Sequence, residues 1–78
     1  MAVNSNLFMI EVFATNITTE GKAKKVLNQI QEAFPDYMAN FDLEDCDKIL
    51  RIETHKTIID TKSIIRLINE MNGQASLL

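Results

Sequence analysis

The chain has 78 residues, of which 46% are hydrophobic and 24% are charged. These proportions are ordinary for a globular protein, and a chain of this length folds around one hydrophobic core. The net charge of −3 argues against a nucleic-acid partner, because binding to a phosphate backbone needs clustered lysine and arginine. We therefore predict a single domain over residues 1–78 that does not bind nucleic acid.

The sequence also argues against a membrane protein. No stretch approaches the roughly 20 apolar residues that cross a bilayer, and the N-terminus lacks the basic segment and cleavage site of a secretory leader. The single cysteine, Cys46, cannot form an internal disulfide, which fits a reducing compartment. We expect a cytoplasmic protein without a membrane partner.

The first half of the chain predicts a strand, a helix and a second strand. Residues 7–15, LFMIEVFAT, are rich in β-forming side chains. Thr18 or Thr19 can then cap a helix, whose apolar residues recur at three- and four-residue steps until Pro35 ends it. Residues 37–43 alternate between apolar and polar side chains, which is typical of a strand.

The second half predicts a hairpin partner and a second helix. After an acidic turn, residues 48–54 alternate again, so the second and third strands form a hairpin. Asp60 or Thr61 can cap the second helix. Asn72 and Gly73 supply the left-handed residue that commonly closes a helix.

A short final strand over residues 74–78 completes the order βαββαβ. This order predicts a ferredoxin-like α+β fold, a two-layer sandwich of a four-stranded antiparallel sheet with two helices on one face. In this sandwich we expect seven apolar residues to face the core: Val26, Ile30, Phe41, Leu50, Ile52, Ile64 and Ile68.

Four segments of the chain resemble the heavy-metal-associated (HMA) domain family, which includes copper chaperones and the soluble domains of metal-pumping ATPases. They are the end of the first strand, FATNI, the helix segment KVLNQI, the hairpin FDLEDCDKILRIE and the C-terminal segment NGQASLL. The resemblance runs from about residue 7 to residue 78, and it implies the same βαββαβ fold.

In that family the loop after the first strand carries Cys-x-x-Cys, whose thiolates bind a soft ion such as Cu(I) or Zn(II). Placing this sequence on the motif from Thr15 puts Thr19 at the first cysteine position and Lys22 at the second. A threonine hydroxyl is a poor donor, and a lysine ammonium repels a cation. The resemblance therefore implies a degenerate member without the metal motif, and we expect no metal and no cofactor.

Thr19 and Lys22 have simpler interpretations as a helix cap and a solvated first-turn residue. The functional alternative is that Lys22 binds a carboxylate of a partner. Cys46 and His55 are the weak alternative metal ligands, but they lie nine residues apart across the hairpin, a spacing that does not bring them together. A metal-handling protein that uses such non-standard or inter-subunit ligands is the alternative function.

No segment predicts an enzyme, because the chain lacks a nucleophile beside a base and a glycine-rich phosphate loop. We expect no catalytic residues. The third strand, KILRIET, lacks the aromatic residues that stack on bases in RNA-binding sheets of this topology. A small-molecule regulatory domain of the ACT type shares the topology and stays open as a third class.

The first strand has apolar side chains on both faces, although helices cover only one face of the sheet. In the register of the family Phe13 points inward, and Phe8, Ile10 and Val12 stand on the open face beside Ile49. An apolar patch with a polar rim suits a protein contact. We predict a protein partner or a homo-oligomer through this face; the alternative is that residues before about Ile10 leave the sheet.

Overall fold

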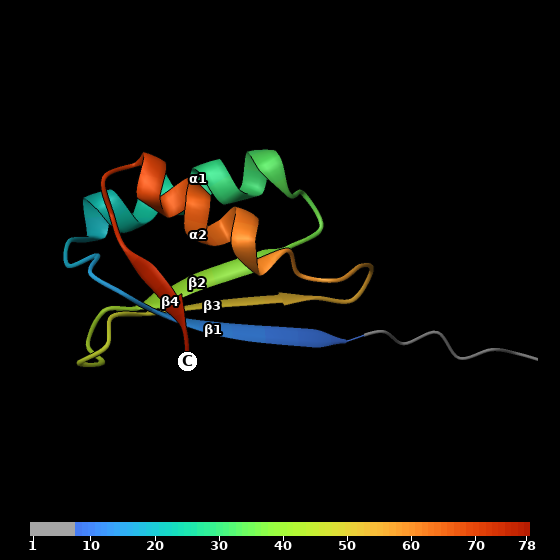
Figure 1. The fold of residues 1–78 in the computed structure, drawn as a ribbon, viewed down its shortest axis with the longest axis horizontal. Helices are drawn as coiled ribbons and strands as arrows, with labels where there is room; N and C mark the ends of the chain where they lie inside the picture. The colour runs from blue at the N-terminus through green and yellow to red at the C-terminus, as the bar shows by residue number, and fades with distance from the viewer. Residues whose placement is uncertain (1–7) are drawn as a thin grey trace, which may run out of the picture.

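The computed structural model describes residues 8–78, which form one sheet and two helices (Figure 1). The elements are β1 (Met9–Thr15), α1 (Glu20–Ala33), β2 (Met38–Asp42), β3 (Ile49–Thr54), α2 (Thr61–Glu70) and β4 (Ala75–Leu77). The strands are antiparallel in the order β2-β3-β1-β4, and both helices lie on the same face of the sheet. This confirms the predicted ferredoxin-like sandwich. Within the described residues, neither helix is long and apolar enough to cross a membrane.

Side-chain caps set the start of each helix. Oγ1 of Thr19 accepts a hydrogen bond from the backbone N–H of Lys22 at 3.2 Å, which satisfies a donor that the first turn of α1 leaves unpaired. Asp60 caps α2 and accepts from the backbone N–H of Ser63 at 3.1 Å and from its hydroxyl at 2.7 Å. The hydroxyl of Ser63, and then its N–H, lower the pKa of the Asp60 carboxyl because they stabilise its charged form.

The end of α2 needs both Asn72 and Gly73, for different reasons. Asn72 takes the left-handed conformation, with φ of 65°, whereas Gly73 has no positive φ. A Cβ atom at Gly73 would lie 2.9 Å from Cγ2 of Ile68 and 3.0 Å from Cδ1 of Ile17. The glycine is therefore required by close packing, and the asparagine supplies the left-handed residue that the sequence predicted at this pair.

β1 lies in the middle of the sheet and sets its register. Phe13 pairs with Leu50 of β3 and with Leu77 of β4. Phe13 is fully buried under the helices, so the alternate residues of β1, Ile10 and Val12, point to the open face. This confirms the predicted register; the predicted start of the strand at residue 7 lies outside the described residues.

The core lies between the sheet and the two helices. Of the seven expected core residues, Phe41 alone is only partly buried, because it lies on the edge strand β2. Besides Phe13, four buried apolar residues lie outside the expected seven: Ala23 on α1, Tyr37 before β2, Ile17 in the loop before α1 and Ile59 in the loop before α2. The buried apolar residues are Phe13, Ile17, Ala23, Val26, Ile30, Tyr37, Leu50, Ile52, Ile59, Ile64 and Ile68.

Truncation of Leu50, Ile52 or Ile68 to alanine should lower the free energy of unfolding by about 2–5 kcal/mol, because each change leaves a cavity in the core. All three side chains are 0% exposed. Ile58→Ala is the matched control: its side chain is 66% exposed, so we expect a change below about 0.5 kcal/mol. Urea denaturation measures the free energy of unfolding of the core variants and of the control. Equal losses at the buried and exposed positions would contradict the core described above.

Two glycine substitutions should change stability in opposite directions. Gly73→Ala should lower the free energy of unfolding by roughly 1–3 kcal/mol, because its Cβ would be forced against Ile68 and Ile17. Gly21→Ala should raise it by up to about 1 kcal/mol, because Gly21 lies in α1 with no atom within 4 Å of a new Cβ. Thermal denaturation compares the two variants. A Gly73→Ala protein as stable as the wild type would show that this loop can move away from α2.

Candidate functional site

The loop between β1 and α1, where the family carries its metal motif, is held by hydrogen bonds to two neighbouring connections. The backbone N–H of Thr15 donates to the carbonyl of Asp47 at 2.9 Å, and its hydroxyl donates to the carbonyl of Lys48 at 2.6 Å. Asn16 donates its N–H to the carbonyl of Gln74 at 3.2 Å and accepts the Gln74 N–H on Oδ1 at 2.8 Å. The β2–β3 turn and the α2–β4 loop therefore fix the start of this loop.

Thr19 and Lys22, the residues that the sequence places at the two ligand positions, both have structural hydrogen bonds. Oγ1 of Thr19 is the α1 cap, as predicted. Nζ of Lys22 donates to the carbonyl of Asn72 at 3.3 Å, just beyond the end of α2. A cation at the C-terminal end of a helix stabilises its dipole. Lys22 thus joins the first turn of α1 to the end of α2 and is half-buried, not simply solvated as expected.

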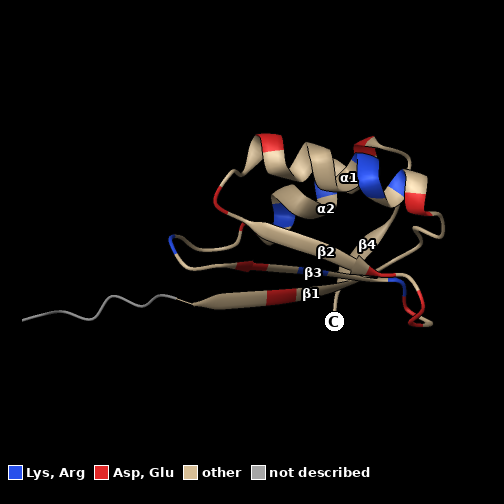
Figure 2. Cartoon of the chain, turned by 180° about the vertical axis from the view of Figure 1, so that it is seen from behind, with Lys and Arg blue, Asp and Glu red and all other residues tan. Residues whose placement is uncertain are grey.

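A shallow hollow of about 520 Å³ lies beside these residues. It is lined by Thr19, Gly21, Lys22, Lys25 and Met71, and the lysines of α1 mark this end of the helix in Figure 2. None of the lining residues is a cysteine, a histidine or a carboxylate. Two ammonium groups and the positive end of the α1 dipole oppose a cation here.

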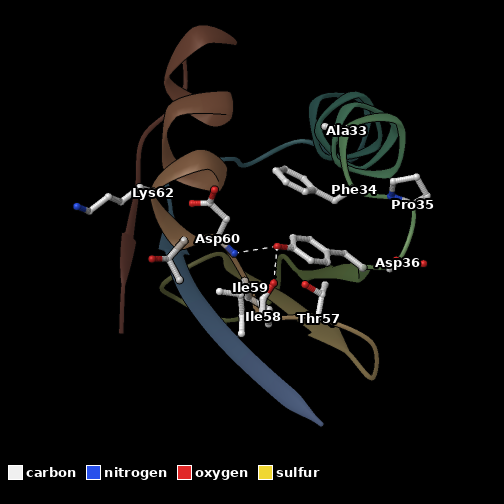
Figure 3. Close-up of a pocket in the computed structure, with 11 residues that line it drawn as sticks. Ala33, Phe34, Pro35, Asp36, Thr57, Ile58, Ile59, Asp60 and Lys62 are labelled. Atoms are coloured by element: carbon white, nitrogen blue, oxygen red, sulfur yellow. Dashed lines mark hydrogen bonds between the residues drawn. The ribbon is translucent and has the colours of Figure 1, made fainter. Parts of the chain in front are cut away.

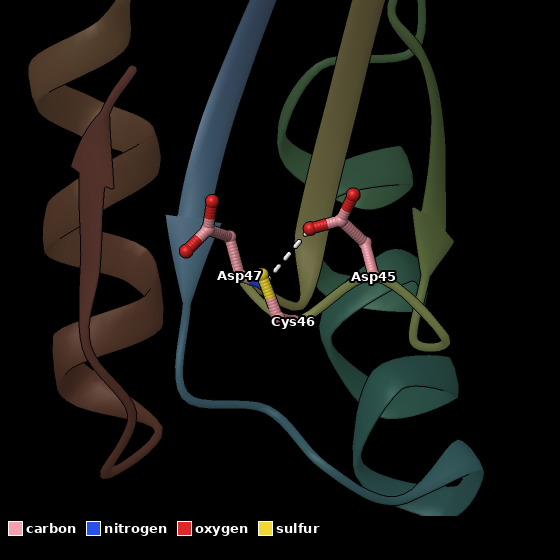
Figure 4. Close-up of side chains that lie close together, drawn as sticks. All are labelled: Asp45, Cys46 and Asp47. Atoms are coloured by element: carbon pink, nitrogen blue, oxygen red, sulfur yellow. Dashed lines mark hydrogen bonds between the residues drawn. The ribbon is translucent and has the colours of Figure 1, made fainter.

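Possible ligand atoms do gather at a different place, the β2–β3 turn (Figure 4). The ligand atoms of Asp45, Cys46 and Asp47 all lie within 4.8 Å of one another, and all three residues are exposed. Oδ1 of Asp45 already accepts the backbone N–H of Asp47 at 2.8 Å, so the turn itself uses one carboxylate oxygen. Lys48 completes the turn with φ of 47°. The arrangement agrees with the solvated acidic hairpin that the sequence predicted.

His55 lies at the opposite end of β3 from Cys46. The six residues of β3 separate the two by about 20 Å, at roughly 3.3 Å for each residue of a strand. The imidazole of His55 instead lies against Phe8, with ring centroids 4.6 Å apart and an interplanar angle of 38°. The structure therefore does not bring the two alternative ligands together within one chain.

A pocket of about 570 Å³ opens at the other end of the helix layer, between the α1–β2 connection and the loop before α2 (Figure 3). The hydroxyl of Tyr37 donates to the carbonyl of Ile58 at 2.9 Å and accepts the N–H of Asp60 at 2.8 Å. The ring of Phe34 stacks on Tyr37 with centroids 4.6 Å apart. No pattern in the sequence indicates this pocket, because it forms where an irregular loop folds over Tyr37. Its lining includes no cysteine or histidine.

The open face of the sheet carries an apolar stripe, which we define as Phe8, directly before β1, and Ile10 and Val12 on β1. Phe8 is 50% exposed and Ile10 is 37% exposed. Beside the stripe on β3, Glu53 pairs with Ile10 and Arg51 pairs with Val12 in the register of the two strands. Nε of Arg51 lies 3.7 Å from Oε1 of Glu53. The stripe therefore has an ion pair along one side, which agrees with the predicted apolar patch and polar rim.

Comparison with known proteins supports the fold. No protein-family model matches the chain, and no curated protein matches it. Among solved structures, it is similar to the apo form of the HMA domain of a copper chaperone for superoxide dismutase, with a TM-score of 0.63 and 15% sequence identity. The match covers 100% of this chain and 74% of that chain. The chain therefore has the fold of an HMA domain.

Proposed function

We propose that this chain is an HMA-like domain that has lost the metal ligands of its β1–α1 loop and acts as a protein-interaction module through its open sheet face. One observation carries the proposal. Thr19 and Lys22 stand at the two expected ligand positions, and the fold itself uses both, one as a helix cap and one as a bond to Asn72. We propose further that it is not an enzyme and that it works in the cytoplasm.

The chemistry of the loop supports the loss of metal binding. Cu(I) selects thiolate ligands, and Zn(II) is bound by thiolate, imidazole or carboxylate. The hollow beside Thr19 offers none of these groups and carries two lysines, Lys22 and Lys25. A cation that entered would have to displace the Lys22 ammonium from the Asn72 carbonyl, which lies 3.3 Å away. The loop keeps the position of a metal site without its donors.

The open face supports the interaction role. Both helices lie on the other side of the sheet, so in the described part of the chain no element covers the stripe of Phe8, Ile10 and Val12. Complete burial of such side chains is worth about 1.5–3 kcal/mol each before the costs of association. Phe8 is 50% exposed, Ile10 37% and Met38 on β2 51%, so about half of that free energy or less is left to gain, which suits a weak protein contact.

A second candidate function, metal handling, is favoured by the exposed group in the β2–β3 turn. Asp45, Cys46 and Asp47 present two carboxylates and one thiol within 4.8 Å. Zn(II) accepts such ligands but normally takes four, so this site would need a further donor such as His55 of another copy. The interaction role ranks first because it needs no ligand from outside the chain.

Metal titration separates the two candidates. The reduced wild-type protein should bind Cu(I) or Zn(II) no more tightly than a peptide with a single free thiol, in competition with a chromogenic chelator. Thr19→Cys combined with Lys22→Cys should create a stoichiometric site for Cu(I), because the hydrogen bonds of Thr15 and Asn16 hold the start of the loop in place. A tight wild-type complex that Cys46→Ser abolishes would contradict the proposal and favour the β2–β3 turn.

Ile10→Lys should weaken every protein association of the chain by at least tenfold while leaving the monomer folded, because the new charge would sit in the middle of the stripe. Far-UV circular dichroism checks the fold, and sedimentation velocity or capture of a co-purifying protein checks association. Ile58→Lys is the control, since Ile58 is 66% exposed in the loop before α2. Unchanged association, or an unfolded Ile10→Lys chain, would count against the open face as the binding surface.

A further inference from the structure

Side chains on the open face form rows across the strands, because paired residues of neighbouring antiparallel strands point to the same face. The pairings of β1, β2 and β3 fix the order of the rows. The first row, at one end of the sheet, holds Phe8 and His55. The second row holds Met38, Glu53 and Ile10, and the third holds Asn40, Arg51 and Val12. The last row, at the other end, holds Asp42 and Ile49 beside Ala14 and Ser76.

This order makes the face complementary to itself under one rotation. The rotation is about a twofold axis that lies between the open faces of two copies. The axis runs parallel to the faces and perpendicular to the strands, midway between the Glu53 row and the Arg51 row. The axis places each strand over the same strand of a second copy and exchanges the two rows. Arg51 then faces the second copy's Glu53, and Ile10 faces the second copy's Val12. Arg51 and Glu53 therefore meet opposite charges, and Ile10 and Val12 meet each other, whereas Asp42, at the end of β2, lies outside these two central rows.

We propose that the partner of the open face is a second copy of this chain, docked face to face about this axis. The inference rests on the proposed function, because it names the occupant of the surface assigned there. A C2 interface requires one patch that is complementary to itself. Two aligned sheets that pack face to face are a common arrangement, with the layers about 10 Å apart.

The outer rows fit the same axis. The rotation places the row of Phe8 and His55 over the second copy's row of Ala14 and Ile49. The large ring of Phe8, directly before β1, thus meets the methyl group of Ala14 on β1 of the second copy, which lets the two sheets approach. Phe8 is 50% exposed in the single chain, so it has area left to bury.

The alternative axis, parallel to the strands, is much less favourable. It would lay β3 of one copy over β1 of the other, so that Arg51 and Glu53 would cover the apolar stripe without opposite charges above them. Covering this pair with apolar side chains would remove both charges from water without adding an opposite charge, which is costly. In the proposed arrangement the pair of each chain, now 3.7 Å apart and with side chains 50% and 23% exposed, joins a ring of four alternating charges. Such charges fix orientation more than strength.

Charge reversal tests the arrangement. Arg51→Glu leaves two carboxylates on β3, and Glu53→Arg leaves two guanidinium groups, so neither variant should pair with itself. An equimolar mixture of the two variants should form a heterodimer, and the double variant R51E/E53R should pair with itself as the wild type does. Sedimentation velocity over a wide range of protein concentration measures all four samples, with circular dichroism to confirm folding. Asp36→Lys is the control, because it disrupts the Lys56–Asp36 pair, which is not on this face.

We expect the dissociation constant of each single variant to be at least tenfold above that of the wild type. The dissociation constant of the mixed heterodimer should return to within about threefold of the wild-type value. A second measurement does not depend on the reversals. In a Cys46→Ser background, a short bis-maleimide should cross-link copies carrying Phe8→Cys to copies carrying Ala14→Cys; sheets about 10 Å apart leave these thiols too distant for a direct disulfide. The two positions lie six residues apart along extended chain, so the short linker cannot join them within one copy.

Three results would overturn the inference: a wild-type chain that stays monomeric, variants that fail to associate when mixed, or no cross-linked product. If the monomeric wild type still binds a different protein, and Ile10→Lys abolishes that binding, the proposed function stands and the occupant named here is wrong. Tight metal binding in the β1–α1 loop would instead overturn the proposed function.

Discussion

Both helices lie on one face of the four-stranded sheet and leave the other face uncovered, and the rest of this molecule depends on that arrangement. β1 lies in the middle of the sheet, so its side chains divide between a sealed core and an uncovered surface. Phe13 goes to the core and is 0% exposed, whereas Ile10 on the other side is 37% exposed. In water an uncovered apolar row on a central strand favours association. The same strand therefore stabilises the fold and presents the surface through which we propose that the domain works.

The β1–α1 loop is held in place by contacts with distant parts of the chain. Its ends are fixed by Thr15 and Asn16, and its middle is anchored by the buried side chain of Ile17. The ammonium of Lys22 bonds to the carbonyl of Asn72, which connects the first turn of α1 to the end of α2. These contacts keep the loop in place without an ion. The solved HMA domain of a copper chaperone shares the fold at 15% identity, and that likeness extends to the architecture alone.

Most of the architecture could be predicted from the sequence, because periodicity, caps and turns are local signals. The Thr19 and Asp60 caps, the hairpin and the inward register of Phe13 all follow from residues a few positions apart. Contacts between distant segments could not be predicted. The bond from Lys22 to Asn72 spans fifty residues, and the burial of Ile17 and Ile59 depends on loops without periodicity. Phe41 follows the strand pattern, but its place on an edge strand leaves it partly exposed. The role of Gly73 depends on its distance to Ile17, which no local pattern indicates.

The central proposal is that binding takes place on the open sheet face and not in the β1–α1 loop. Amide spectra of the 15N-labelled, reduced chain, recorded at rising protein concentration with one equivalent of Cu(I), test this claim most directly. We predict concentration-dependent shifts at Phe8 to Val12, Arg51 and Glu53, and no copper-dependent shift from Asn16 to Lys22. Copper-dependent shifts across that loop, with an open face that does not respond to concentration, would contradict the claim.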